Sequence, residues 1–144
     1  MDDNTLLELD RRKKYLKRYK RNGILIERLE NRLRSLETRI QGVKSPSLSG
    51  MPRGGTPVTR EDLIADKVDL ERRIRRLKTK GDTMRTELLD LIDEVDDPRY
   101  AEVLESFFVD CKSFTEIAED MGYTERHVIR LYSEAILALS LSGQ

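Results

Sequence analysis

Two proline-free stretches of this chain carry their apolar residues at alternating intervals of four and three positions, the spacing of a coiled-coil seam. The first stretch covers residues from about 4 to 41, and the second runs from Thr59 to about residue 95. A helix through either stretch would be about 50–60 Å long at 1.5 Å per residue. The first seam comprises Tyr15, Tyr19, Asn22, Ile26, Leu29, Leu33, Leu36 and Ile40, and the second comprises Leu63, Lys67, Leu70, Ile74, Leu77, Gly81, Met84, Leu88, Leu91 and Val95.

The segment between the two seams, residues 42–59, interrupts every apolar period. It holds four of the eight glycines and three of the four prolines, so we expect a flexible loop. Similar helix lengths joined by a loop favour an antiparallel hairpin that buries both seams within one chain. The alternative is an intermolecular coiled coil in a homodimer. Asn22-Gly23 is either a turn or a weak point in a continuous helix, and we favour the continuous helix because the seam keeps its register.

The C-terminal third carries start and stop signals for shorter helices. Asp97 suits an N-cap and Pro98 suits the first position of a helix that ends near residue 110. Ser113 and Glu116 match a capping box that begins the next helix, and Gly122 suits its left-handed end. We therefore expect an all-α protein, with a long antiparallel helical hairpin over residues 1–95 and a small domain of three to four helices over residues 96–144.

The segment Phe114–Tyr132 has the layout of a helix-turn-helix, in which a short helix and a glycine turn precede a longer helix capped by Thr124. Such a motif places the start of its second helix in the DNA major groove. Arginine there can donate two hydrogen bonds to guanine, and the helix N-terminus can hold a phosphate. We expect Tyr123 and Val128 to point inward. The predicted DNA-binding residues are Thr124, Glu125, Arg126, His127 and Arg130; the alternative is a module that contacts only protein.

The net charge of zero hides an uneven distribution. Residues 1–44 carry 13 Lys/Arg against 7 Asp/Glu, whereas residues 81–144 carry 5 against 15. The predicted motif therefore lies in the acidic part, although phosphate neutralisation supplies much of DNA affinity. A basic run in the first helix either contacts phosphates or docks on the acidic domain; its basic residues are Arg11, Arg12, Lys13, Lys14, Lys17, Arg18, Lys20 and Arg21. A second cluster, Arg72-Arg73 with Arg75-Arg76, is typical of the solvated face of a coiled coil.

The reactive residue types are scarce. The single cysteine, Cys111, excludes an internal disulfide, and the single histidine, His127, has no catalytic set around it in the sequence. No Gly-rich loop follows a strand, so we expect no enzyme, no cofactor and no metal. No apolar run reaches about 18 residues, and the N-terminus lacks the apolar core of a signal peptide. We expect a cytoplasmic protein without membrane contact.

Residues from about Tyr100 to Leu139 resemble region 4 of bacterial sigma factors. The resemblance rests on the stretch EIAEDMGYTERHV, from Glu116 to Val128. A basic helical hairpin before such a domain also resembles small phage-encoded regulators of late genes, of the ArpU and RinA kind. The resemblance implies an activator of transcription in the bacterial host cytoplasm, which binds double-stranded promoter DNA and has RNA polymerase as a candidate partner. One departure is Ile129, which stands where sigma factors commonly have lysine.

Two other functions fit parts of the same pattern. Small terminase subunits, which recognise packaging sites on DNA, also combine helix-turn-helix units with oligomerising helices, and a ring in solution would favour that function. A coiled-coil adaptor that binds protein without DNA would suit the acidic charge of residues 81–144. The sequence does not distinguish an activator from a repressor.

Overall fold

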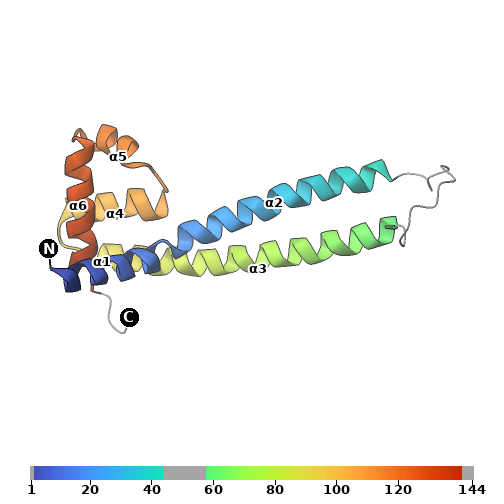
Figure 1. The fold of residues 1–144 in the computed structure, drawn as a ribbon, viewed down its shortest axis with the longest axis horizontal. Helices are drawn as coiled ribbons and strands as arrows, with labels where there is room; N and C mark the ends of the chain where they lie inside the picture. The colour runs from blue at the N-terminus through green and yellow to red at the C-terminus, as the bar shows by residue number, and fades with distance from the viewer. Residues whose placement is uncertain (1, 44–57, 141–144) are drawn as a thin grey trace. The chain divides into compact units, whose positions relative to one another are not determined.

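The computed structural model describes residues 2–43 and 58–140, and its elements are all helical (Figure 1). Their order is α1 (Asp3–Leu16), α2 (Arg18–Gly42), α3 (Arg60–Asp93), α4 (Pro98–Leu104), the π-helical turn η1 (Glu105–Val109), α5 (Phe114–Met121) and α6 (Glu125–Ala138). The described residues contain no strand, so the predicted all-α class is confirmed. None of these helices is both long and apolar enough to cross a membrane.

The first predicted helix is interrupted at Lys17, between α1 and α2. The backbone there has a ψ of −3°, whereas an α-helix has about −42°. Arg18 donates from Nε to the Tyr15 carbonyl at 3.1 Å, and its guanidinium carbon lies 4.0 Å from the centre of the Tyr15 ring. Gly23, by contrast, lies inside α2, so the helix continues through Asn22-Gly23 as favoured from the sequence.

Helix α2 packs closely against α3 within one chain, and the two run antiparallel (Figure 1). Two ion pairs join them: Lys67 Nζ lies 3.7 Å from Glu37 Oε1, and Lys78 Nζ lies 3.0 Å from Glu30 Oε1. The helical hairpin expected from the two seams is therefore present. Residues 44–57, which form most of the predicted loop, lie outside the described residues.

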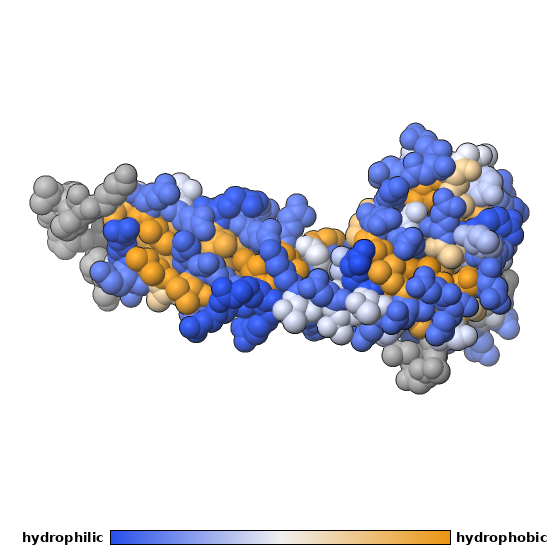
Figure 2. Space-filling model, turned by 180° about the vertical axis from the view of Figure 1, so that it is seen from behind, coloured by the Kyte–Doolittle hydropathy of each residue, from blue (hydrophilic) through white to orange (hydrophobic). Residues whose placement is uncertain are grey.

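The apolar core between α2 and α3 is thin. Leu36, Ile40 and Leu63 form a buried cluster, with Leu70 packed against it. Figure 2 shows apolar side chains reaching the surface between charged ones in this part of the molecule. A pair of helices can bury only one stripe each, so burial of apolar area stabilises this hairpin less than it would a thicker bundle.

The predicted helix from 98 to 110 is α-helical only as far as Leu104. Its start follows the prediction, because Asp97 Oδ1 accepts a hydrogen bond from the Arg99 amide at 2.9 Å. From Glu105 the helix widens into η1, in which the adjacent Phe107 and Phe108 are both buried. Apolar spacing could not predict this change, because the wider turn depends on how the aromatic rings pack against other helices.

Four aromatic rings lie at the centre of the core that η1, α5 and α6 share. The Phe107 ring centre lies 4.9 Å from that of Phe108, 4.9 Å from that of Phe114 and 4.8 Å from that of Tyr132. Edge-to-face and stacked pairs of this kind add to the energy of area burial. The rings thus hold α5 and α6 against η1, with Val128 fully buried beneath them.

The described residues divide into two compact units. One, the helix-turn-helix unit, comprises the chain up to Asn22 and from Lys80 onward; the other, the hairpin unit, is Gly23–Thr79. This division differs from the expected domains 1–95 and 96–144. The reason is that Leu16 of α1 and Leu88 of α3 belong to the same buried cluster as the C-terminal helices.

Candidate nucleic-acid interface

Helix α5 begins with the capping box that the sequence predicts. Ser113 Oγ accepts a hydrogen bond from the Glu116 amide at 3.2 Å, and Glu116 Oε1 accepts one from the Ser113 amide at 3.2 Å. Ile117 and Ala118 face the core and are buried. Ala118, with its small side chain, belongs to the same buried cluster as Val128 of α6.

The turn between α5 and α6 depends on Gly122. Its φ of 72° and ψ of 31° lie in the left-handed region, which residues with a Cβ adopt at a cost. The Tyr123 amide donates to the Ala118 carbonyl at 3.0 Å, which closes the end of α5. The prediction that Tyr123 points inward is wrong: its side chain is exposed, with its ring edge-on to His127 at 4.6 Å between centres.

Helix α6 presents one face to the core and the opposite face to solvent. Thr124 Oγ1 accepts a hydrogen bond from the His127 amide at 3.1 Å and so caps the helix. The buried face contains Val128, Leu131, Tyr132, Ala135 and Ile136, so the prediction that Val128 points inward is confirmed. Leu139 is also buried and lies just past the helix. At 3.6 residues per turn, Arg126 and Arg130 fall one above the other on the exposed face.

The predicted DNA-binding side chains are brought together at the start of α6, and two of them are held by neighbours. Arg130 Nη2 lies 2.8 Å from His127 Nδ1, which fixes the direction of the guanidinium. Glu125 accepts a hydrogen bond from Thr115 of α5. Thr115 was not among the predicted residues, because its contact depends on how α5 and α6 cross. Arg126 is exposed at the start of the helix.

Arg12, in the basic run of α1, caps the C-terminus of α6. Its Nη1 lies 3.0 Å from the carbonyl oxygen of Ile136, 3.1 Å from that of Leu137 and 2.7 Å from that of Leu139, and donates to them. These carbonyls lie in the last turn and at the C-cap of α6, where backbone amide partners are scarce; among them, the Ile136 carbonyl also accepts from the Leu139 amide at 3.3 Å. Arg12 therefore makes its contacts within the chain, and its role as a phosphate contact stays a prediction.

Other cations of the same run are also engaged inside the helix-turn-helix unit. Lys13 Nζ lies 5.5 Å from the centre of the Tyr132 ring, and Lys20 Nζ lies 4.9 Å from the centre of the Phe107 ring. Arg18 pairs with Glu87 at 3.3 Å. These contacts favour the docking alternative for the run. Of its remaining members, Arg11 pairs with Glu8, Lys17 is half-buried, and Lys14 and Arg21 are exposed.

Carboxylates dominate the surface around the motif. Glu116, Glu119, Asp120 and Glu125 are exposed on α5 and the first turn of α6. Asp120 accepts a hydrogen bond from Lys112 at 2.8 Å, and this bond raises the pKa of the ammonium group. The charge of Lys112 is thus compensated locally. The motif offers specific donors on α6 but little general attraction for phosphate.

No group of His, Cys, Asp or Glu in the described parts of the chain could hold a metal ion. Comparisons of the chain with protein-family models, with curated proteins and with solved structures find no match. The geometry and charge of the two units are therefore the basis for any functional conclusion.

Proposed function

We propose that this chain is a sequence-specific DNA-binding regulator of transcription, which reads double-stranded DNA through α6. The observation that carries the proposal is the pair of exposed arginines, Arg126 and Arg130, one turn apart on the outer face of a helix whose inner face is buried against α4 and α5. A rigidly held helix with arginines on its free face suits base-edge recognition in the major groove.

The chemistry of the individual side chains supports base readout. An arginine that donates two hydrogen bonds to guanine O6 and N7 discriminates against other bases by about 1–3 kcal/mol. His127 restrains Arg130 before any ligand is present, so less side-chain freedom is lost on binding. The capped N-terminus of α6 offers backbone amides to one phosphate. In this proposal the regulator is an activator encoded by a phage or prophage, with RNA polymerase as a second partner.

One observation favours a second candidate, a protein-binding adaptor. The exposed carboxylates on α5 and at the start of α6 would repel phosphates and would instead suit a basic protein surface. An adaptor would use the same exposed face of the motif without reading bases. The two functions differ in whether a duplex with a defined sequence is selected.

Selection of duplexes from a random library tests the proposal. Wild-type protein and a variant carrying Arg126→Gln and Arg130→Gln are each incubated with the library, and bound duplexes are sequenced over several rounds. We expect the wild type to enrich a motif and the double variant to lose preference at the guanines of that motif. A control variant, Arg85→Gln with Arg99→Gln, removes the same charge from exposed positions outside the motif and should keep the preference.

Two outcomes would contradict the proposal. An unchanged motif in the Arg126/Arg130 variant would show that α6 does not read the bases. Absence of any enriched sequence for the folded wild-type protein would favour the adaptor.

A further inference from the structure

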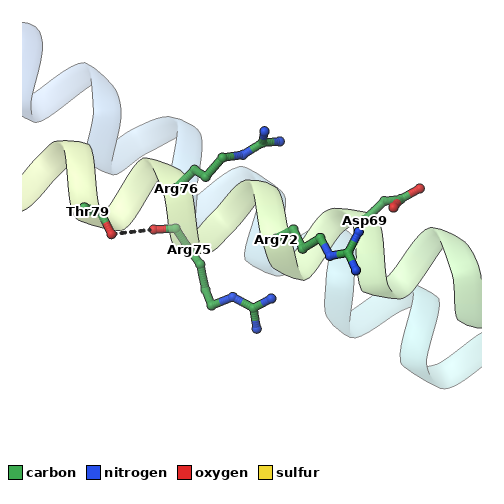
Figure 3. A pocket seen from close by; sticks show the side chains of 5 residues that line it. All are labelled: Asp69, Arg72, Arg75, Arg76 and Thr79. Carbon is green, nitrogen blue, oxygen red and sulfur yellow. Dashed lines mark hydrogen bonds between the residues drawn. The ribbon is translucent and has the colours of Figure 1, made fainter.

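Three exposed arginines of α3 form a basic surface in the hairpin unit. Arg72, Arg75 and Arg76, here called the arginine face, lie within five residues of one another on the side of α3 away from the seam. Figure 3 shows Arg75 and Arg76 extending to opposite sides of the helix and Arg72 running along it. All three, together with Asp69 and Thr79, line an open depression of about 610 Å³.

The arginine face is not compensated by the chain itself. The ion pairs of the described hairpin residues use lysines, Lys67 with Glu37 and Lys78 with Glu30, and include none of the three arginines. Asp69 lines the same depression, and the ion pairs of the described hairpin residues do not include it. Like charges three and four positions apart destabilise a helix. The three arginines therefore repel one another along α3, and the nearby carboxylates of Glu71 and Glu30, which line a depression with Arg75, form no ion pair with it among the described residues.

The form of the surface indicates what kind of anion fits it. The depression is open and its guanidiniums diverge, so it cannot enclose a small anion (Figure 3). Arg72 and Arg76 are four residues apart, which is about 6 Å along the helix axis. A neighbouring depression between α2 and α3 adds three more arginines, since Arg32, Arg39 and Arg73 line it together with the carboxylates Asp66 and Asp69. An extended row of negative charges can contact such a surface at several points.

We infer that the arginine face binds the phosphate backbone of duplex DNA and supplies affinity without sequence preference. The inference rests on the proposed function, because a DNA-reading motif on an acidic unit needs phosphate contacts from elsewhere. In the basic run that spans the end of α1 and the start of α2, Arg12 and Arg18 are engaged within the chain, which leaves Lys14 and Arg21 as exposed cations without such a contact among the described residues. Guanidinium groups suit phosphate because they donate hydrogen bonds in a planar fork and stay charged at every working pH.

The test compares binding of the full-length wild type and an Arg72→Gln, Arg75→Gln, Arg76→Gln variant to duplex DNA over a range of salt concentrations. Two duplexes are used, the motif selected by the wild type and a scrambled sequence of the same composition. Each phosphate contact contributes about 0.9 to the slope of log K against log salt, so losing three contacts should lower the slope by about 2.7. Between about 50 and 200 mM salt, the wild type should then lose about 40-fold more affinity than the variant.

A matched control separates the arginine face from net charge. The variant Arg18→Gln, Lys67→Gln, Lys78→Gln also removes three positive charges, but these side chains are paired with the carboxylates of Glu87, Glu37 and Glu30. Its salt slope should remain close to that of the wild type. Circular dichroism of all three proteins checks that the helices are retained. A smaller salt dependence of binding then cannot be attributed to unfolding.

The outcomes distinguish this inference from the proposed function. A weaker and less salt-dependent affinity on both duplexes, with the same selected motif, supports the inference. An unchanged slope in a variant that still selects the motif overturns it while the proposed function stands. If the wild type selects no motif but binds scrambled duplex through the three arginines, the inference holds and the proposed function fails. Loss of self-association or of protein binding without any change in DNA affinity also overturns the inference.

Discussion

Replacing Arg12 by methionine should destabilise the helix-turn-helix unit, because Arg12 ties α1 to the end of α6. Its side chain is only 18% exposed, and its Nη1 reaches the carbonyls of Ile136, Leu137 and Leu139. Methionine keeps the length and the apolar stem of the side chain but cannot donate. The last carbonyls of α6 would then lose a charged donor that also complements the negative end of the helix.

The expected magnitude follows from the number of hydrogen bonds. One terminal nitrogen of a guanidinium carries two N–H groups, so two of the three carbonyls are fully bonded at a time. A hydrogen bond to a charged group contributes about 1.5–3 kcal/mol, and water replaces part of that at a helix end. We expect the free energy of unfolding to fall by about 2–3 kcal/mol. With an m-value of about 2 kcal/mol/M, the urea midpoint should fall by about 1 M.

Urea denaturation followed by circular dichroism at constant pH and salt measures this change. Arg11→Met is the matched control, since Arg11 lies on the same helix and also pairs with Glu8 but is 63% exposed. We expect that variant to unfold within about 0.5 kcal/mol of the wild type, because exposed ion pairs contribute little. Equal midpoints for Arg12→Met and the wild type would refute the argument that Arg12 holds α1 on α6.

Two further predictions concern the glycines at positions 23 and 81 and the phenol of Tyr132. A Cβ at position 81 would lie 2.7 Å from Nδ2 of the buried Asn22, whereas a Cβ at position 23 would meet nothing within 4 Å. In thermal melts, Gly23→Ala should therefore raise the stability by up to about 1 kcal/mol, and Gly81→Ala should lower it. Equal gains in stability for the two variants would contradict the close approach of Asn22 to position 81. Burial raises the pKa of Tyr132 to about 12 from an ordinary value of 10.0. The folded state thus keeps the Tyr132 proton more tightly, so this stabilisation is complete below about pH 10 and is lost as pH rises toward 12. Urea midpoints measured at several alkaline pH values should fall more steeply for the wild type than for Tyr132→Phe, and parallel slopes would contradict the burial of this phenol.

The local signals of the sequence predicted the ends of several helices correctly. Asp97, Ser113 and Thr124 each cap the helix that was expected to follow, and Gly122 adopts the left-handed conformation expected at the turn. Such signals act over three or four residues, so they depend little on the rest of the fold. The start of α6, where the candidate recognition residues lie, could be predicted for the same reason.

The contacts between distant segments of the chain were harder to predict from the sequence. Tyr123 was expected inward and is exposed, because the core is already filled by Phe107, Phe114 and Tyr132. The spacing of the apolar residues predicts neither the π-helical turn η1 nor the interruption at Lys17. Both depend on how side chains from other helices fit against them.

The sequence by itself determined an all-helical chain with two long seams, a capped helix-turn-helix and an uneven distribution of charge, because periodicity, caps and composition are local properties. Only the tertiary structure decided which cations are available to a ligand. It directs Arg12 and Arg18 of the basic run to partners within the chain and leaves Arg72, Arg75 and Arg76 exposed without an ion pair in the described hairpin. The physical reason is that a charge is compensated by whatever the fold places within a few ångströms of it, which the order of residues does not specify.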